Sequence, residues 1–400
     1  MAITQPMDTP KVDLSRAPWT MHEFFAGSGL VAYGLKGIFS PVWANDISEK
    51  KAGVYRSNFN SNHFILGDIK NITGSNLPNA HLSWASFPCQ DLSLAGTLGG
   101  IDAARSGLVW EWFRILREMS ERQAVLLIEN VAGLLSSNEG QNYAKLHHAL
   151  LELGYKSGAM LIDAIQFVPQ SRPRVFVIAV RHDVVIPQEL IDTQPNWLHN
   201  KAAVNLGKVL PEWVWWRAEK PPKRHSCLAD IIDFSVPYDK DDVLRIISPR
   251  HKEKLDSMKS AVATGYRRTR GGKQYLELRF DGVAGCLRAP GGGSSKQFLI
   301  VKRDDKSRAR LLSPRETARL MGAPDSFVLP DTYNDGYRAM GDAVVLPVAT
   351  FIGEMFLTKK SGSVAFLMIL LRQSLILQDF PLVKSLEKQH LQKSLYAQWC

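Results

Sequence analysis

The feature that most constrains this chain is an alternation of strand-like and helix-like stretches over its first 180 residues. Short apolar runs rich in β-branched and aromatic residues are separated by stretches whose apolar residues recur about every 3.6 positions. The strand-like runs are TMHEFFAG, SPVWAND, HFILGD, HLSWASF, AVLLIENV and RVFVIAV. This alternation predicts an α/β fold with a doubly wound, mostly parallel sheet. Because RVFVIAV soon follows the strand-like MLIDAIQF, these two can form a hairpin at one edge.

The alternation decays after about residue 185, and helical signals return near Leu311. The 400 residues exceed one ordinary core, so we expect a second, smaller and irregular domain between these points. In SPRETARLMG, the order Ser313, Pro314 and Glu316 predicts a helix start with an N-cap, a first-turn proline and a capping box. GDAVVLPVATFIGEMFL then predicts a last long helix.

The chain carries a net charge of +10, and the excess is concentrated in one segment. Between Arg245 and Arg310 there are 17 lysines and arginines against 6 aspartates and glutamates. A segment this basic indicates a polyanionic partner. The alternative is a basic face that only contacts solvent.

The four cysteines, Cys89, Cys227, Cys286 and Cys400, have no CxxC spacing. We therefore predict neither a metal site nor a disulfide framework. The N-terminus lacks the apolar stretch of a secretory signal, and the apolar run at 364–371 is too short to span a bilayer. The sequence thus predicts a cytoplasmic protein that does not associate with membranes.

A cofactor signal lies in HEFFAGSGL, where Gly27 and Gly29 follow a strand-like run and precede a helix. Glycines at this turn let a ligand approach the backbone. Asp46 ends the next run, 19 residues after Gly27, where an acid can bind ribose hydroxyls, and Asp68 ends the third run, where it can accept from an adenine amine. Because the longer GxGxxG is missing, an adenosyl ligand without a pyrophosphate fits best. Turn glycines and capping aspartates are the alternative.

A second group of residues indicates covalent chemistry. Cys89 follows Pro88 at the end of one predicted strand, and Glu129 ends the next. A thiolate beside a carboxylic acid suits conjugate addition, because one group attacks and the other supplies a proton. The arginines of QSRPR, at 170–174, can hold a carbonyl oxygen of the substrate.

These motifs carry a resemblance to a known family. FAGSG, NDIS, GDI, FPCQ, ENV, QSRPR, RETARLMG and GDAVVLPV follow one another as in DNA cytosine-5 methyltransferases of bacterial restriction–modification systems. The resemblance covers about residues 20–180 and 311–355. It implies a Rossmann-like methyltransferase fold with a smaller target-recognition domain, S-adenosylmethionine as cofactor and double-stranded DNA as substrate. The cytosine must be flipped out of the helix, because its C6 is inaccessible in a stacked pair.

The resemblance also implies a domain organisation. We expect an N-terminal tail at 1–19, a catalytic and cofactor-binding domain at 20–184 and a target-recognition domain at 185–305. A segment at 306–360 would return to the catalytic domain, and 361–400 has no predicted role.

By the same resemblance, Cys89 attacks C6 of the cytosine, and Glu129 contacts N3 and the exocyclic amine. The methyl group is then added at C5, and loss of the C5 proton expels the cysteine. Arg174 holds the base oxygen, while Arg172 steadies its loop and the phosphates. The implied cofactor-binding residues are Phe25, Ala26, Gly27, Gly29, Asp46, Ile47, Asp68, Ile69, Pro88 and Asp342. Asp46 and Asp342 depart from the glutamate and asparagine that are commoner there, and we expect little loss of activity.

For DNA binding the resemblance points to the loop after Cys89 and to the basic segment. The predicted contacts are Gln90, Ser93, Arg267, Arg268, Arg270 and Lys273. Whether the arginines bind phosphates or guanines stays open, with phosphates favoured. We expect the tryptophans at 213–216 to pack rather than stack on bases. We expect a monomer. Whether a companion restriction endonuclease or defence proteins act on the same site stays open.

The sequence argues against three other functions. An RNA cytosine-5 methyltransferase of the same fold is disfavoured, because the Cys-Phe-Thr triplet of the transfer-RNA branch is absent. A non-catalytic DNA-binding regulator is disfavoured by the presence of both Cys89 and Glu129. A nicotinamide oxidoreductase would explain the glycines and Asp46 but not FPCQ, ENV or the basic segment.

Overall fold

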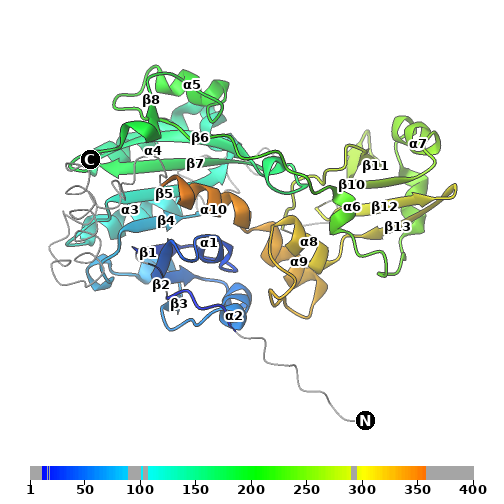
Figure 1. Cartoon of the computed structure of the whole chain (residues 1–400), viewed down its shortest axis with the longest axis horizontal. Coiled ribbons are helices and arrows are strands. Elements are labelled where there is room, and N and C mark those ends of the chain that lie inside the picture. Colours follow the sequence, from blue (N-terminus) through cyan, green and yellow to red (C-terminus); the bar gives the residue numbers. More distant parts are fainter. Residues whose placement is uncertain are drawn as a thin grey trace, which may run out of the picture.

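The computed structural model describes residues 11–15, 17, 19–88, 101, 107–289 and 295–356. A seven-stranded sheet forms its larger part (Figure 1). The strands are β1 (Trp19–Phe24), β2 (Phe39–Asp46), β3 (Phe64–Leu66), β4 (Leu82–Ala85), β5 (Val125–Val131), β6 (Tyr155–Asp163) and β7 (Pro173–Arg181). Their order is β3-β2-β1-β4-β5-β7-β6, and β7 alone runs in the direction opposite to the other six. The predicted mostly parallel sheet is confirmed, and so is the β6–β7 hairpin at one edge.

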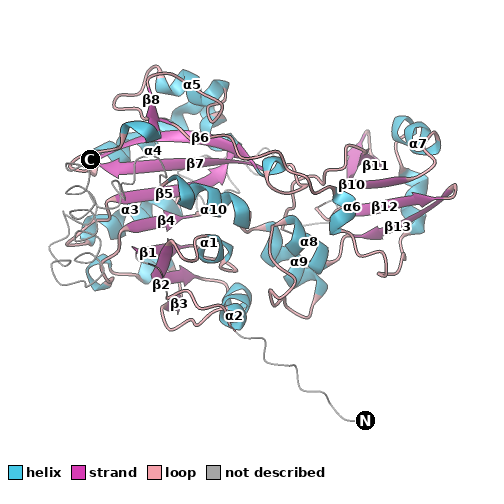
Figure 2. Ribbon diagram, viewed as in Figure 1, coloured by secondary structure: helices cyan, strands magenta, loops and turns pink. Residues whose placement is uncertain are grey.

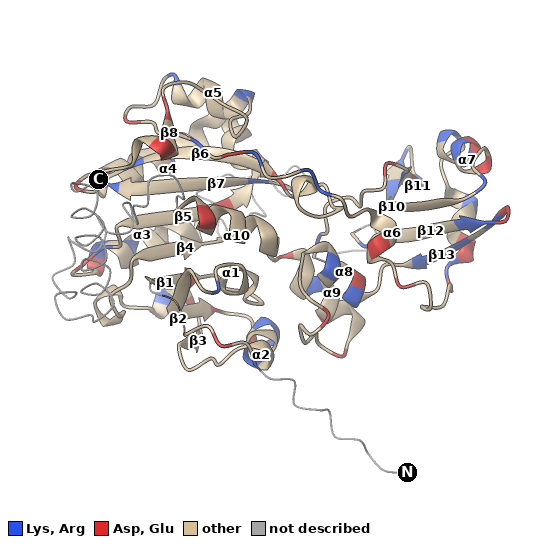
Figure 3. Cartoon of the chain, in the orientation of Figure 1, with Lys and Arg blue, Asp and Glu red and all other residues tan. Residues whose placement is uncertain are grey.

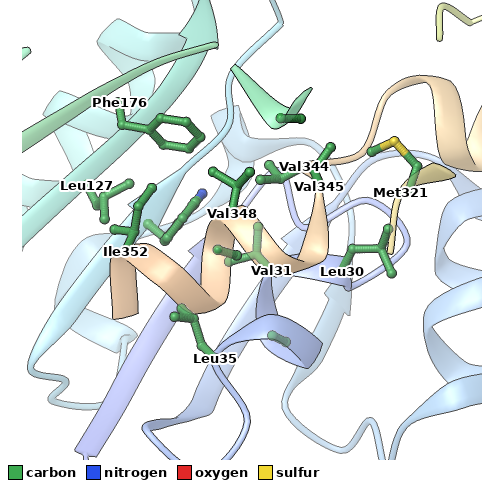
Figure 4. Close-up of a cluster of buried hydrophobic side chains, with 14 of the residues drawn as sticks. Leu30, Val31, Leu35, Leu127, Phe176, Met321, Val344, Val345, Val348 and Ile352 are labelled. Atoms are coloured by element: carbon green, nitrogen blue, oxygen red, sulfur yellow. The ribbon is translucent and has the colours of Figure 1, made fainter. Parts of the chain in front are cut away.

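Helices cover both faces of this sheet. On one face lie α1 (Leu30–Gly34), α2 (Glu49–Asn58) and α10 (Leu346–Met355), and on the other lie α3 (Leu108–Glu118) and α4 (Gln141–Glu152). Figure 4 shows Val31 of α1 and Leu35, which follows α1, beside Val348 and Ile352 of α10, with Phe176 of the sheet nearby. Burying one such aliphatic side chain stabilises the fold by about 1.5–3 kcal/mol. This packing holds the end of the described chain against its beginning.

The strand order reverses between β1 and β4, which pair directly, with Phe24 opposite Ala85. At such a switch point the connections leave in opposite directions and open a crevice beyond the carboxyl ends of the strands, where ligands bind. The topology therefore predicts the binding site at the ends of β1, β2, β4 and β5.

A second sheet forms a separate lobe, which we call the small lobe (Figure 2). Its antiparallel strands are β10 (Ala261–Arg270), β11 (Lys273–Arg279), β12 (Phe298–Arg303) and β13 (Lys306–Leu311), in the order β11-β10-β12-β13. Helix α7 (Pro249–Asp256) accompanies them, and Leu255, Leu276 and Ile300 belong to a core of their own. Lysines and arginines recur over this lobe (Figure 3).

The small lobe begins later in the chain than we expected for the recognition domain. The first part of the predicted 185–305 range packs on the seven-stranded sheet instead, through β8 (Ile191–Asp192), α5 (Lys201–Gly207) and β9 (Trp215–Trp216). Trp216 is buried there, and Trp213 bridges to Ser157 of β6. These tryptophans give the segment an apolar face, and the exposed edge of β6 is the nearest surface that can bury it. Helix α6 (Leu228–Ile231) follows on the way to the small lobe.

Two helices connect the lobes, α8 (Pro314–Leu320) and α9 (Tyr333–Gly341). The predicted start of α8 is confirmed, because Ser313 and Glu316 form a capping box with a proline in the first turn. The predicted long helix from Gly341 is wrong. The chain breaks after α9 and restarts at Leu346, because Pro347 lacks the N–H of a helix interior and fits a first turn.

Short 3-10 helices complete the description, at Ile69–Asn71, Gly74–Asn76, Ala132–Leu135, Ser137–Gly140, Ala164–Gln166, Gln188–Leu190 and Asp241–Ile246. No helix in the described part of the chain combines the length and apolar character that a bilayer crossing requires.

Candidate active site

A cavity of about 280 Å³ opens at the predicted switch point. Residues that the sequence assigned to the cofactor and residues that it assigned to catalysis line it together. The first group is Phe25, Ala26, Gly27, Asp46, Ile47, Asp68, Ile69, Pro88 and Asp342, and the second is Glu129, Arg172 and Arg174. Side chains from opposite ends of the chain thus share one cavity.

The turn after β1 is held by the end of β2. The amide of Ala26 donates to the carbonyl of Asn45 at 2.8 Å, and the amide of Gly27 donates to Oδ2 of Asp46 at 2.9 Å. The amide of Ser48 donates to Oδ1 of Asp46 at 2.8 Å. Gly27 has a positive φ of 59°, which glycine adopts without strain. Each carboxylate oxygen of Asp46 keeps a second lone pair, so this fixed side chain can still accept from ribose hydroxyls.

Gly29 is the exception among the predicted cofactor residues. It does not line the cavity but lies against the aromatic side chains of α2 and its C-terminal end. A Cβ at this position would stand 2.4 Å from the ring of Phe59 and 2.8 Å from that of Tyr55, and φ is +83°. Gly29 is therefore required for close packing and for the turn, and its role toward the cofactor stays a prediction.

The other end of the cavity has the features of a nucleoside site. Asp68 caps a 3-10 helix, and its Oδ1 accepts from the amide of Lys70 at 3.0 Å, which fixes the carboxylate. Ile47 lines the cavity although 67% of it is exposed, so an apolar surface is open for a flat ring to cover. Together with Asp46 and the turn at Gly27, these groups fit an adenosyl ligand.

Glu129 and Arg174 face each other where β5 and β7 meet the cavity. The Nε of Arg174 lies 3.2 Å from Oε1 of Glu129, and both side chains are largely buried. Burial raises the pKa of Glu129, while Arg174, Arg172 and a hydrogen bond from Ser86 partly oppose that rise. This environment makes Glu129 easier to protonate than a free carboxyl group, next to a cation that can hold a carbonyl oxygen.

Arg172 acts as a tether between segments. Its Nη1 donates to the carbonyl of Leu287 at 2.7 Å, and its Nη2 donates to those of Gly341 and Ala343 at 3.0 and 2.8 Å. The residue is 3% exposed. The expected steadying of a loop fits this position, whereas the expected contact with phosphates does not, because the guanidinium is buried against backbone carbonyls.

Sequence reasoning missed several residues that shape this site. The side-chain amide of Asn130 donates to the carbonyl of Phe87 at 3.2 Å and so holds the end of the FPC segment. Cys286 lies against both arginines, with Sγ 3.5 Å from Nη1 of Arg172 and 3.7 Å from Nη2 of Arg174. Burial alone would raise the pKa of this thiol, but the two arginines lower it. The ENV motif contained Asn130 as a signal, whereas nothing local marked Cys286.

Among the predicted DNA contacts, those in the small lobe lie around one hairpin. Arg270 and Lys273 flank a two-residue turn, Gly271-Gly272, in which both residues have positive φ, and Arg268 lies two residues before Arg270. Arg268 is exposed, and Arg270 pairs with Glu277 at 3.4 Å. The guanidinium of Arg267 lies over the ring of Phe298 with its Nε buried, whereas the exposed Arg268 lies over the ring of Tyr266.

Cys89, Gln90 and Ser93 lie outside the described residues, so their predicted roles stay predictions. Within the described residues, no group of three or more histidine, cysteine, aspartate or glutamate side chains is placed to hold a metal ion.

Comparison of the sequence with known protein families identifies the family to which the chain belongs. The sequence model described as C-5 cytosine-specific DNA methylase matches residues 19–357. The chain belongs to this family. It is thus a DNA cytosine-5 methyltransferase, as the order of its motifs implied.

Individual relatives agree with this assignment. The chain is 27% identical over 341 residues to the type II methyltransferase M.Bsp6I of Bacillus sp. (strain RFL6), across 82% of this chain and 96% of that protein. It is 26% identical over 344 residues to M.HhaI of Haemophilus parahaemolyticus, across 82% and 91%. The solved structure of the S. pombe Dnmt2 methyltransferase shares the fold, with a TM-score of 0.57, 19% identity and coverage of 85% and 98%.

Proposed function

We propose that this methyltransferase transfers the methyl group of S-adenosylmethionine to C5 of a flipped-out cytosine in a specific double-stranded DNA sequence, through a covalent bond between Cys89 and C6. The observation that carries the proposal is the shared cavity. The nucleoside-binding features at Asp46 and Asp68 open onto the same space as the pair of Glu129 and Arg174.

Glu129 is suited to activate the base. A carboxyl group that keeps its proton can donate to N3 of cytosine while its other oxygen accepts from the exocyclic amine. Such donation withdraws electrons from the ring and makes C6 a better electrophile for the thiolate of Cys89. Positioned proton donors of this kind contribute about 10²–10⁴-fold in rate.

Arg174 is suited to hold the base oxygen. Its Nε lies 3.2 Å from Glu129, so a ring that presents N3 to the carboxyl group would bring its neighbouring carbonyl oxygen to the guanidinium. Arg172 contributes indirectly, because it ties the segment after Ala284 and the segment around Asp342 to the loop that carries Arg174.

S-adenosylmethionine, when bound, supplies an electrophilic methyl group. The residues that would hold it are those fixed around the cavity, with Asp46 on the ribose, Asp68 on the adenine amine and Ile47 against the ring. The turn at Phe25–Gly27 would carry the bridge between nucleoside and amino acid.

The DNA is proposed to lie between the cavity and the small lobe. The hairpin of β10 and β11 carries exposed Arg268, Arg270 and Lys273, and Gln90 and Ser93 would contact the DNA from the loop after Cys89. Since the relatives M.Bsp6I and M.HhaI are named type II methyltransferases, we propose a restriction–modification role in the cytoplasm. A companion endonuclease would recognise the same site, and the enzyme would act as a monomer.

The test is to incubate the protein with unmethylated DNA and S-adenosylmethionine and to map 5-methylcytosine by bisulfite sequencing. We expect methylation within one short sequence, no product with Cys89→Ala, and a rate lower by about 10²-fold or more with Glu129→Gln, which keeps the shape of the side chain and can still hydrogen-bond but cannot transfer a proton. Methylation of transfer RNA with untouched DNA would replace this proposal by the RNA alternative.

A further inference from the structure

Lys51 lies in α2, and its side chain reaches the rim of the cavity. Its Nζ lies 3.1 Å from Oδ2 of Asp342, and the side chains are 24% and 38% exposed. Both residues line the cavity. Asp342 directly follows α9, so this ion pair joins two distant parts of the chain across the rim.

A neighbouring pair shows that joining the helices does not require Lys51. Lys50 donates to Asp335 of α9 at 2.8 Å from the outer side of α2, with 64% of the lysine side chain exposed. Neither Lys50 nor Asp335 lines the cavity. The outer pair already links α2 to α9, whereas the inner pair places one positive and one negative charge beside the cavity.

The pair of Lys51 and Asp342 lies between the turn at Gly27 and the part of the cavity lined by Arg172. The stem of Lys51 lies beside Gly27, with its Cδ 4.0 Å from the place where a Cβ of that glycine would stand. On the other side, Arg172 holds the carbonyls of Gly341 and Ala343, the two residues that flank Asp342. The backbone around Asp342 is thereby fixed from the catalytic side.

The charges around the cavity distinguish Lys51 from the other cations. Among the described residues that line the cavity, the cations are Lys51, Arg172 and Arg174. Arg172 binds backbone carbonyls, and Arg174 faces Glu129. Lys51 is the one beside the Gly27 turn. Burial alone would lower the pKa of Lys51, but the carboxylates of Asp342 and Asp46 raise it above its usual value, so the ammonium stays charged.

We propose that Lys51 and Asp342 bind the amino-acid end of the cofactor, with the ammonium of Lys51 taking its carboxylate and the carboxylate of Asp342 taking its ammonium. This rests on the proposed function, because it specifies which end of S-adenosylmethionine occupies this side of the cavity. The pair presents one positive and one negative charge to the cavity. When a zwitterion binds, each of these charges can pair with the opposite charge of the ligand, so that none is left unpaired.

The experiment compares three ligands by isothermal titration calorimetry with the full chain and without DNA. S-adenosylmethionine carries both charges of the amino-acid end, decarboxylated S-adenosylmethionine lacks only the carboxylate, and 5′-methylthioadenosine lacks the whole amino-acid end. The variants are Lys51→Met, the conservative Lys51→Arg, Asp342→Asn and the matched control Lys50→Met, which removes a lysine from the same helix outside the cavity.

We expect the unaltered protein to prefer S-adenosylmethionine over its decarboxylated form. Lys51→Met should weaken the binding of S-adenosylmethionine by about tenfold or more, since a charged hydrogen bond is lost. It should also erase most of the preference over the decarboxylated form. Lys51→Arg should restore part of it. Asp342→Asn should weaken the binding of both ligands that carry the ammonium group. No variant should change the affinity for 5′-methylthioadenosine more than about twofold. Lys50→Met should behave as the unaltered protein.

Equal weakening of S-adenosylmethionine and its decarboxylated form by Lys51→Met, or no weakening of either, would overturn the assignment while leaving the proposed function intact. An unaltered protein that binds none of the three ligands would overturn both.

Discussion

Glu129 shows how burial prepares a single side chain for its proposed task. It is 8% exposed at the end of β5, and burial raises its pKa, which eases the protonation that a hydrogen bond to the base would need. When folding raises the pKa of a carboxyl group, the folded state favours its protonated form. Ionising the group at higher pH therefore lowers both the activity and the free energy of unfolding.

The expected pH dependence follows from that sign. The single-turnover methylation rate should rise with pH while Cys89 ionises and fall again as pH passes through the raised pKa of Glu129. In Glu129→Gln the rate should be low, and the fall at high pH should be missing. Quenched-flow measurements on a short duplex, with circular dichroism at each pH as a control for folding, give both profiles. An alkaline fall that persists in Glu129→Gln would assign it to another group.

At the scale of elements, the joint between β13 and α8 holds the two lobes together. Arg310 of β13 and Glu316 of α8 are 2% and 0% exposed and make two hydrogen bonds, of 2.6 and 2.7 Å. Glu316 also accepts from the amides of Ser313 and Asp233. A buried ion pair with this many partners fixes the orientation of the segments that it joins.

Removing one partner of this pair should therefore be costly. Glu316→Gln should lower the free energy of unfolding by about 3–5 kcal/mol, because it leaves the guanidinium of Arg310 buried without its counter-charge. Asp325→Asn on the exposed pair with Arg319 is the control, with an expected change of at most about 1 kcal/mol. Urea unfolding followed by tryptophan fluorescence measures both. Similar losses of unfolding free energy in the two variants would contradict the larger contribution assigned to the buried pair.

The same joint shows how far sequence reasoning reaches for an element. The capping box of Ser313 and Glu316 was predictable because its residues are three positions apart and act locally. The partner of Glu316 on β13 was not, since nothing local reveals which strand a helix will meet. Arg172 is a similar case, because QSRPR marked an important arginine without showing that it binds backbone carbonyls from two other segments.

For the whole molecule, alternation along the first 180 residues predicted the sheet, and the ordered motifs predicted which side chains share its cavity. That part of the segment after residue 185 packs on the large sheet was not predictable, because this irregular segment has no period that tells which sheet it will join. The ion pair of Lys51 and Asp342 was missed for a related reason, since contacts between distant segments leave no trace in local spacing.

The arrangement of the two lobes also predicts how DNA affinity responds to salt. Arg268→Ala, at the exposed hairpin of the small lobe, should weaken binding to all sequences alike and reduce the slope of log affinity against log salt by about one, as a phosphate contact does. Arg267→Ala should leave that slope unchanged, because its guanidinium lies over the ring of Phe298 with its Nε buried. Fluorescence anisotropy at several salt concentrations measures the slopes. A loss by Arg268→Ala confined to one base position would assign base reading instead.

The most direct test of the central claim uses a duplex with 5-fluorocytosine at the cytosine that bisulfite mapping identifies. Fluorine at C5 cannot leave as the proton does, so the step that expels Cys89 is blocked and the enzyme should remain bound to the base. We predict a denaturation-resistant complex that requires S-adenosylmethionine, with mass spectrometry locating the methylated base on Cys89, and no complex with Cys89→Ala. If the protein binds both the duplex and the cofactor yet forms no covalent complex, the account of this cavity as the site of cytosine methylation is contradicted.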